Sequence, residues 1–225
     1  MSRKIVVAVT GASGSIYARA LIDALVVARK HEPMAIAAVV SSTAPEVWTH
    51  ELGGSIREFF AARDVPVFEG RDYHAPFASG SARWDSMAIV PCSMSTVAKV
   101  AHGISDDLLS RAADVMIKER RKLVLVARET PLSVIHLENL LTLSRAGAVV
   151  LPAMPSFYGK PSTIDEVVGT VVARVLDQLG VDNREAKRWG DDVTIEADRS
   201  DAKIEPRAGV AGGDLRRTVK DGRGR

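Results

Sequence analysis

The feature that most constrains the fold of this chain is a regular alternation of short apolar runs with longer stretches of helical spacing. Residues 4–10 (KIVVAVT) are mostly apolar and β-branched, and they run directly into Gly11. Such a run is typical of a buried parallel strand that enters a turn. Residues 15–30 then carry apolar side chains at the three- and four-residue spacing of an amphipathic helix. The two segments together predict the start of a βαβ unit.

The same alternation continues to about residue 180. Because strands that alternate with helices form parallel sheets with right-handed crossovers, it predicts a doubly wound, flavodoxin- or Rossmann-like α/β fold. We expect this single domain to cover residues 1–190, with Pro91 ending the third strand and Pro131 in the first turn of a helix. Further strands are expected at residues 35–40, 87–90, 122–127 and 148–151, and further helices at residues 43–52, 93–102, 105–121, 130–145 and 163–179.

Charge is distributed unevenly along the chain. Residues 199–225 contain eight basic and four acidic residues, so this segment carries +4 and leaves −2 for residues 1–198 of a chain whose total is +2. The mildly acidic body argues against a nucleic-acid partner. Residues 191–225 are polar and glycine-rich, and are expected to form a flexible basic C-terminal tail because they cannot bury enough apolar surface to offset their ordering entropy.

The cysteine content and the hydropathy of the chain exclude several classes of protein. The chain has one cysteine, Cys92, and its five histidines are scattered, so we expect neither a disulfide framework nor a metal site. No apolar run approaches the roughly 20 residues that span a bilayer. The first residues form a strand pattern rather than a signal peptide. We therefore expect a cytoplasmic protein without a membrane partner.

The loop after the first strand, TGASGS, is the first candidate binding element. Loops at the carboxyl ends of parallel strands bind ligands, and a helix N-terminus there attracts phosphate. Ser13 stands where a dinucleotide fingerprint has its second glycine, and the second strand ends in Ser41 and Ser42 rather than a carboxylate. No tyrosine is followed by lysine four residues later. A mononucleotide such as FMN therefore suits the loop better than NAD, although a purely structural turn remains an alternative.

Several cations lie where they could hold an anion. Arg111, Asp114 and Lys118 share one face of a predicted helix, which fits either a phosphate site or a surface salt-bridge ladder. Arg174 lies at the edge of an apolar helix stripe, so it must be paired, snorkelling or bound to an anion. Arg128 follows a predicted strand.

Small and aromatic residues in loops are the remaining candidates for a binding site. Residues 78–81 (ASGS) permit close backbone approach, and residues 93–96 (SMST) follow a strand and open a helix. The aromatic rings of Tyr73, Tyr158 and Trp189 could form walls for a flat ring or a carbocation, or could equally cover hydrophobic edges.

Taken together, these motifs resemble the UbiX-type flavin prenyltransferases, also described as small subunits of phenolic-acid decarboxylase systems. The resemblance covers about residues 3–190 and is specific, because nine motifs keep their order and spacing. They are TGASG at residues 10–14, ASGS at 78–81, PCSM at 91–94, RAAD at 111–114, KERR at 118–121, RETP at 128–131, HLEN at 136–139, PSFY at 155–158 and RWG at 188–190.

The resemblance implies a flavodoxin-like homo-oligomer, commonly a dodecamer, with sites at subunit contacts. It implies a metal-independent transfer of a dimethylallyl group from dimethylallyl phosphate to N5 and C6 of reduced FMN, and a product that serves UbiD-type decarboxylases. Catalytic roles would belong to Ser13, Glu129 and Lys118, and Tyr73 and Trp189 would be aromatic walls. The implied FMN ligands are Gly11, Ala12, Ser13, Ser41, Ser93, Met94, Ser95, Thr96 and Arg128, and the implied prenyl-phosphate ligands are Ser79, Gly80, Arg111, Lys118, Tyr158 and Arg174.

Three alternatives remain open at this point. A flavin-dependent decarboxylase acting directly would resemble the cysteine decarboxylases, which carry a PASANT-type segment and a catalytic histidine. This chain has PCSMST at residues 91–96 instead. A non-catalytic flavin-carrying decarboxylase subunit would bind FMN tightly without changing its mass. A nicotinamide dehydrogenase is the most distant reading.

Overall fold

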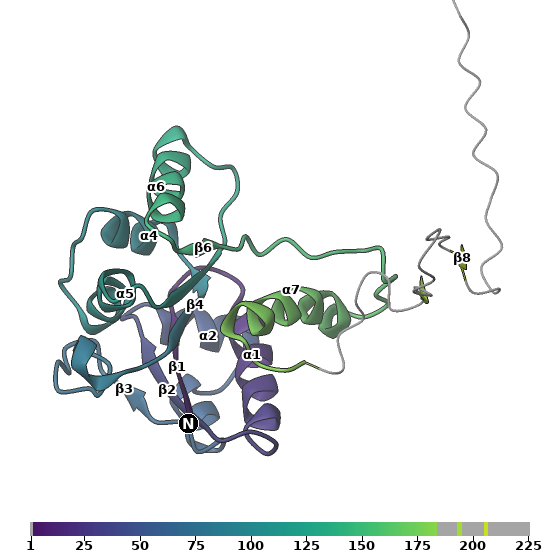
Figure 1. Cartoon of the computed structure of the whole chain (residues 1–225), viewed down its shortest axis with the longest axis horizontal. Helices are drawn as coiled ribbons and strands as arrows, with labels where there is room; N and C mark the ends of the chain where they lie inside the picture. Colours follow the sequence, from purple (N-terminus) through teal and green to yellow (C-terminus); the bar gives the residue numbers. More distant parts are fainter. Residues whose placement is uncertain (1, 184–192, 195–204, 207–225) are drawn as a thin grey trace, which may run out of the picture. The chain divides into compact units, whose positions relative to one another are not determined.

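The computed structural model describes residues 2–183, 193–194 and 205–206. Its centre is a parallel six-stranded sheet in the order β3-β2-β1-β4-β5-β6 (Figure 1). The predicted α/β architecture is therefore confirmed. The strands are β1 (Arg3–Val9), β2 (Met34–Val40), β3 (Val67–Phe68), β4 (Ser86–Cys92), β5 (Lys122–Ala127) and β6 (Val149–Val150).

Helices cover both faces of this sheet. One hydrophobic cluster joins the sheet to α1, α2, α3 and α7, and a second joins its other face to α4, α5 and α6. Figure 1 shows α7 beside α1, where the two helices are in contact. The helices are α1 (Ser15–Ala28), α2 (Ala44–Leu52), α3 (Ile56–Ala61), α4 (Met94–Ala101), α5 (Leu108–Lys118), α6 (Val134–Arg145) and α7 (Ile164–Leu179), with a 3-10 turn η1 (Gly80–Ala82).

The central strand β1 shows why the apolar runs become buried strands. Ile5 and Val7 belong to the cluster on one face of the sheet, and Val6 and Ala8 belong to the cluster on the other. All four side chains are fully buried. Since alternate side chains of a strand point to opposite faces, a continuous apolar run is what a strand covered on both sides requires.

Contact clustering divides the chain into Met1–Ala186 and Lys187–Arg225. In the second unit the structure describes only the short antiparallel pair β7 (Val193–Thr194) and β8 (Glu205–Pro206). Apart from these strands, the expected tail at residues 191–225 lies outside the described residues.

Three boundary predictions were wrong. Strand β4 continues through Pro91 to Cys92, with a register shift against β5 that accommodates a residue lacking an N–H. Helix α6 begins at Val134 rather than near Pro131, because the hydroxyl of Ser133 accepts a hydrogen bond from the backbone N–H of His136. Helix α5 begins at Leu108, where Asp107 caps it in the same way.

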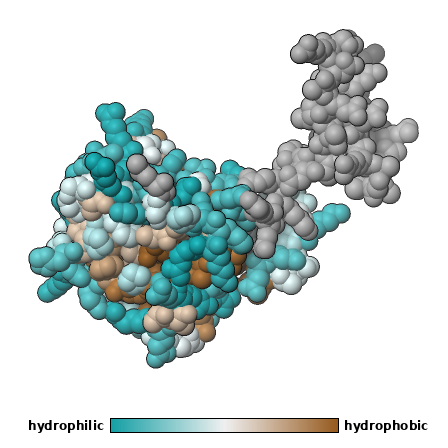
Figure 2. Space-filling view, turned by 60° about the horizontal axis from the view of Figure 1, so that its bottom comes forward, coloured by the Kyte–Doolittle hydropathy of each residue, from teal (hydrophilic) through white to brown (hydrophobic). Residues whose placement is uncertain are grey.

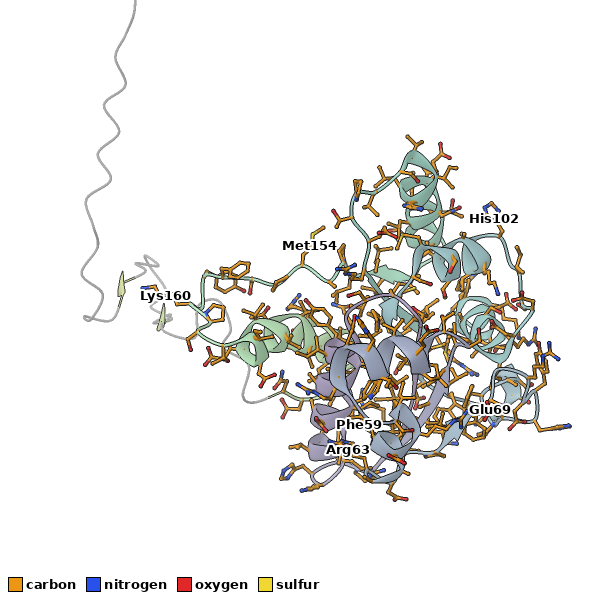
Figure 3. The ribbon with its side chains drawn as sticks, turned by 180° about the vertical axis from the view of Figure 1, so that it is seen from behind. Phe59, Arg63, Glu69, His102, Met154 and Lys160 are labelled. Carbon is orange, nitrogen blue, oxygen red and sulfur yellow. The ribbon has the colours of Figure 1, made fainter. Side chains whose placement is uncertain are left out.

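Large apolar side chains are exposed on α6 and on the segment that leads into α7. On α6 they include Val134, Ile135 and Leu137, and on the following segment Met154 and Phe157. Figure 3 labels Met154 on the extended stretch between β6 and α7. Figure 2 shows one face of the molecule, where hydrophobic residues are visible between hydrophilic ones. None of the described helices has the length and apolar character needed to cross a bilayer.

Candidate functional site

The carboxyl ends of β1, β2, β4 and β5 bring the first group of candidate residues to one edge of the sheet. These strands are parallel neighbours, so the loops at Gly11, Ser41, Ser93 and Arg128 emerge on the same side. The loop after β1, singled out from the sequence, therefore shares this edge with the other three loops.

Thr10, which the sequence reasoning did not single out as a ligand-site residue, ties two of these loops together. It is 1% exposed, and its hydroxyl donates a hydrogen bond to the carbonyl oxygen of Pro91 at 2.7 Å. The same hydroxyl oxygen accepts hydrogen bonds from the backbone N–H of Ser93 at 3.0 Å and of Ala12 at 3.5 Å. One buried side chain therefore fixes the loop after β1 against the start of α4. The sequence signal that could have indicated this role is a hydroxyl side chain at the end of an otherwise apolar strand.

Gly11 and Gly14 are both required, for different reasons. A Cβ on Gly11 would collide with the side chain of Thr43, so the two loops approach too closely for any other residue. Gly14 has a φ of 115°, which L side chains rarely adopt.

A carboxylate from α2 accepts hydrogen bonds from the backbone amides at the start of α1. Glu51 accepts hydrogen bonds from the backbone N–H groups of Gly14 at 3.0 Å and Ser15 at 2.7 Å. Burial alone would raise the pKa of Glu51, but hydrogen bonds from the Ser13 and Ser15 hydroxyls and from these two amides outweigh it and lower that pKa. The helix N-terminus that the sequence offered to a phosphate is thus already satisfied by an internal anion.

A pocket of about 200 Å³ opens beside these loops. Its walls are rich in hydroxyl groups from the end of β2 and the first turn of α4, which suits a phosphate or a polyhydroxylated chain. The Ser93 hydroxyl caps α4 and lies 3.0 Å from the hydroxyls of Ser95 and Thr96. The Met94 side chain, by contrast, is buried in the core, so only its backbone can face a ligand. The lining residues are Ser41, Ser42, Thr43, Ser93, Ser95, Thr96, Lys99, Asp107, Leu109 and Ser110.

Lys99 is a lining residue that sequence reasoning missed. Its ammonium nitrogen lies 2.9 and 3.0 Å from the two carboxylate oxygens of Asp106 and 3.6 Å from Asp107. The hydrogen bond to Asp106 raises the pKa of Lys99, and the same bond lowers the pKa of Asp106. Two carboxylates thus pair with the one cation among the lining residues, and the three groups together carry a net charge of −1.

Arg128 and Glu129 follow β5 at the same edge. The backbone N–H of Arg128 donates to the carbonyl oxygen of Cys92 at 3.1 Å, and its side chain is exposed. Burial raises the pKa of Tyr17, and the charge of Arg128 opposes that shift, so the guanidinium acts on the first turn of α1. Glu129 is exposed and accepts a hydrogen bond from the backbone N–H of Thr130. Burial raises the pKa of the Cys92 thiol, which makes it a packing group rather than a nucleophile.

A second group of candidates lies along α5. The loop at residues 78–81 is bonded to this helix and to the turn that follows it, since Nε of Arg111 donates to the carbonyl oxygen of Ala78 at 3.2 Å and Arg121 donates to that of Gly80 at 2.6 Å. The expected Arg111–Asp114 pair is present at 3.5 Å, whereas Lys118 pairs with Glu119. Arg111, Lys118, Ser79 and Gly80 therefore belong to one neighbourhood on this face of the sheet.

Tyr158 and Arg174 lie elsewhere in the chain. Arg174 is on α7, whose core stripe packs on the opposite face of the sheet from α5. Its side chain is 63% exposed and pairs with Asp177 at 2.7 Å. Tyr158 is exposed on the segment leading into α7, where Ser156 donates a backbone hydrogen bond to Thr170. The six implied prenyl-phosphate ligands thus fall into two groups that one chain does not bring together.

Two remaining predictions concern aromatic rings and metal ions. Tyr73 is exposed in the loop before residues 78–81, and Trp189 lies outside the described residues. Within the described part of the chain, no three His, Cys, Asp or Glu side chains are grouped so that they could hold a metal ion.

Known proteins are similar in sequence to this chain over most of its length. Residues 1–176 match the model of the family described as Flavoprotein. The chain is 42% identical over 187 residues to the flavin prenyltransferase UbiX of Methanocaldococcus jannaschii, covering 83% of this chain and 98% of that protein.

Two solved structures are similar to the whole described domain. One is AnUbiX (PadA1) in complex with FMN and dimethylallyl pyrophosphate, with a TM-score of 0.78, 43% identity and coverage of 84% of this chain and 98% of that one. The other is a dodecameric FMN-dependent UbiX-like decarboxylase from Escherichia coli O157:H7, with a TM-score of 0.77, 46% identity and coverage of 83% and 98%.

Proposed function

Because the chain belongs to the flavoprotein family and, within it, to the UbiX flavin prenyltransferases, we propose how its own residues divide the work of that reaction. The protein is a flavin prenyltransferase that transfers a dimethylallyl group from dimethylallyl phosphate to reduced FMN. The carbon–oxygen bond to the phosphate breaks as a carbon bond forms at N5 of the flavin, which loses its proton, and inorganic phosphate leaves. Protonation of the allyl double bond then lets a carbon bond form at C6, which loses its proton in turn.

The FMN site lies at the carboxyl edge of the sheet. The observation that carries this assignment is the pocket of about 200 Å³ whose walls hold Ser41, Ser93, Ser95 and Thr96. Their hydroxyls can bind a phosphate-bearing polyol chain, and the occupied amides of Gly14 and Ser15 direct the phosphate into this pocket rather than onto α1. Gly11, Ala12 and Ser13 offer close backbone approach beside it, the Met94 backbone opens α4, and Arg128 supplies a cation.

The donor site needs positive charge at the leaving group and a dry, electron-rich wall for the developing cation. Arg111 and Lys118 on α5 provide the positive charge, and Ser79 and Gly80 belong to the same neighbourhood. Arg174 on α7 provides a further cation, and Tyr158 on the segment that leads into α7 provides a ring. Glu129, exposed after the end of β5, would move protons around the flavin, and Ser13, in the loop after β1, would be the other catalytic residue at this edge of the sheet. Tyr73 is a further wall.

Since one chain separates the two groups of donor ligands, we assign them to different copies that meet at one site. The exposed apolar side chains of α6 and of the segment that carries Tyr158 supply surface for such contacts. The E. coli relative is dodecameric, and we expect a homo-oligomer of the same kind here. The prenylated flavin is then passed to a UbiD-type decarboxylase, the partner that the family resemblance implies.

The test is anaerobic incubation with reduced FMN and dimethylallyl phosphate, followed by mass spectrometry of the extracted flavin. Prenyl transfer adds one five-carbon unit to FMN and releases phosphate. The extracted product should also restore carbon dioxide release by a flavin-free UbiD-type decarboxylase. An unchanged flavin would exclude the transfer.

A second candidate is direct decarboxylation, which the name of the E. coli structure favours. Carbon dioxide release from an aromatic acid by this protein with FMN alone would support it.

A further inference from the structure

We propose that Glu119 is an internal counter-charge of the donor-phosphate site, which neutralises Lys118 when no phosphate is bound and re-pairs with Arg121 when phosphate takes Lys118. This inference rests on the proposed role of Lys118 as a phosphate ligand. It adds a residue that competes with the donor and helps the product phosphate to leave.

The first observation is the ion pair between Lys118 and Glu119. The Lys118 ammonium donates a hydrogen bond to Oε1 of Glu119. That hydrogen bond lowers the pKa of Glu119, so its carboxylate is fully ionised at neutral pH. A phosphate that approaches Lys118 therefore meets an anion already bound there, and it must displace the carboxylate to make a charge-assisted contact.

The second observation is that Arg121 already lies within ion-pair distance of the same carboxylate and keeps a free donor for it. Its side chain is 18% exposed, and Oε2 of Glu119 lies 3.9 Å from its Nη2 atom. Nη2 donates to the carbonyl oxygen of Gly80 at 2.6 Å, while Nη1 is buried without a hydrogen-bond partner among the described residues. A buried unpaired guanidinium donor is costly, so an arriving carboxylate gains a strong hydrogen bond.

The third observation is the position of Gly80. A Cβ at this residue would collide with the carboxylate of Glu119, which therefore lies directly against the loop at residues 78–81. Arg111 and Arg121 hold the carbonyl groups of Ala78 and Gly80 from two sides. The loop is thus fixed while the flexible Glu119 side chain has only a short distance to move between its two cations.

This exchange has a measurable consequence for phosphate affinity. With Glu119 in place, inorganic phosphate and the donor bind more weakly than Lys118 would otherwise allow. We therefore expect Glu119→Gln to strengthen competitive inhibition by inorganic phosphate, lowering its inhibition constant about five- to tenfold, as removal of one competing charge near a partly exposed site would do. The KM for dimethylallyl phosphate should fall in parallel.

The matched control is Glu69→Gln. Glu69, labelled in Figure 3, is an exposed glutamate that pairs with Arg57 at 2.5 Å and belongs to neither group of candidate residues. The Glu69→Gln variant should leave the inhibition constant of inorganic phosphate unchanged. An inhibition constant that is the same in Glu119→Gln as in wild type would overturn the inference.

Arg121→Gln tests the second half of the exchange. It should weaken phosphate inhibition severalfold in the wild-type background, because Glu119 then has no alternative partner, and should change nothing in the Glu119→Gln background. Equal weakening in both backgrounds would show that Arg121 only holds the loop, and would overturn the re-pairing.

Lys118→Gln separates this inference from the proposed function. It should weaken phosphate inhibition strongly. If Lys118→Gln has no effect, the proposed donor site is wrong and the inference falls with it. If Lys118→Gln weakens inhibition but Glu119→Gln has no effect, only the counter-charge is wrong.

Discussion

The carboxylate of Glu51 accepts a hydrogen bond from the backbone N–H of Ser15 at 2.7 Å, so the end of α2 caps the beginning of α1. The contact joins residues 36 positions apart in the sequence, and it satisfies amides that a helix of this fold commonly offers to a ligand. It therefore leaves the amides of Gly14 and Ser15 occupied, so an anionic ligand must find its hydrogen bonds elsewhere at this edge.

Glu51→Gln should destabilise the protein by about 1 kcal/mol at neutral pH, the usual value of an anionic acceptor at a helix N-terminus. The pKa of Glu51 is lowered from 4.5 in the folded state, so its stabilisation is present above that value and is lost as the pH falls through the lower folded pKa. Thermal unfolding of both proteins across acidic pH should show a Tm difference that is largest near neutrality and shrinks in acid. A difference that grows in acid would contradict this account.

Thr10→Val should lower both stability and FMN affinity. The change leaves the backbone N–H of Ser93 without its buried acceptor, which costs about 1–3 kcal/mol, while the carbonyl oxygen of Pro91 keeps only the longer hydrogen bond from the backbone N–H of Thr10 at 3.4 Å. Denaturant unfolding and titration with FMN would measure the two effects. Thr49→Val is the matched control, because the exposed Thr49 hydroxyl bonds only to nearby backbone carbonyls, and it should leave FMN affinity unchanged.

Gly11→Ala should disrupt the FMN site by forcing Thr43 away from the loop after β1. We expect FMN affinity to fall at least about tenfold, with destabilisation of about 1–3 kcal/mol from overpacking. Gly70→Ala is the control, because a Cβ there meets no other atom within 4 Å. Equal FMN affinity in both variants would show that the close approach of the two loops is not needed for binding.

Arg174→Ala should impair use of the prenyl donor without changing the stability of the protein. The exposed pair with Asp177 contributes little, so unfolding should change by less than about 0.5 kcal/mol. The KM for dimethylallyl phosphate should rise by roughly tenfold or more, because a charge-assisted phosphate contact is lost, while FMN affinity stays the same. Arg19→Ala, which breaks the surface pair with Asp165, should affect neither quantity.

The sequence predicts the sheet well because its information is local. A β-branched run such as residues 4–10 is apolar at every position, which only a strand covered on both faces can accommodate. The gathering of Gly11, Ser41 and Ser93 follows from that, since carboxyl ends of parallel strands share one edge. Helix α3 was missed because its six residues give less than two turns of periodicity.

Other features depend on contacts between distant segments and could not be read in advance. Glu51 and Lys99 reach the site from the last turns of α2 and α4, where a glutamate or lysine ordinarily indicates a solvated face. Lys118 was expected on the same face as Asp114, but the neighbouring Glu119 competes for it. The separation of Arg174 from Arg111 by the sheet follows only from which face each helix covers.

The most direct test of the shared donor site is complementation between Lys118→Ala and Arg174→Ala. At a donor concentration well below the wild-type KM, each variant alone should transfer little of the dimethylallyl group to reduced FMN. When the two chains are co-expressed with different tags and purified as mixed oligomers, sites that combine Lys118 from one chain with Arg174 from another become possible, and about a quarter of wild-type activity should return. Mixed oligomers that remain as inactive as the single variants would contradict a site built from more than one copy.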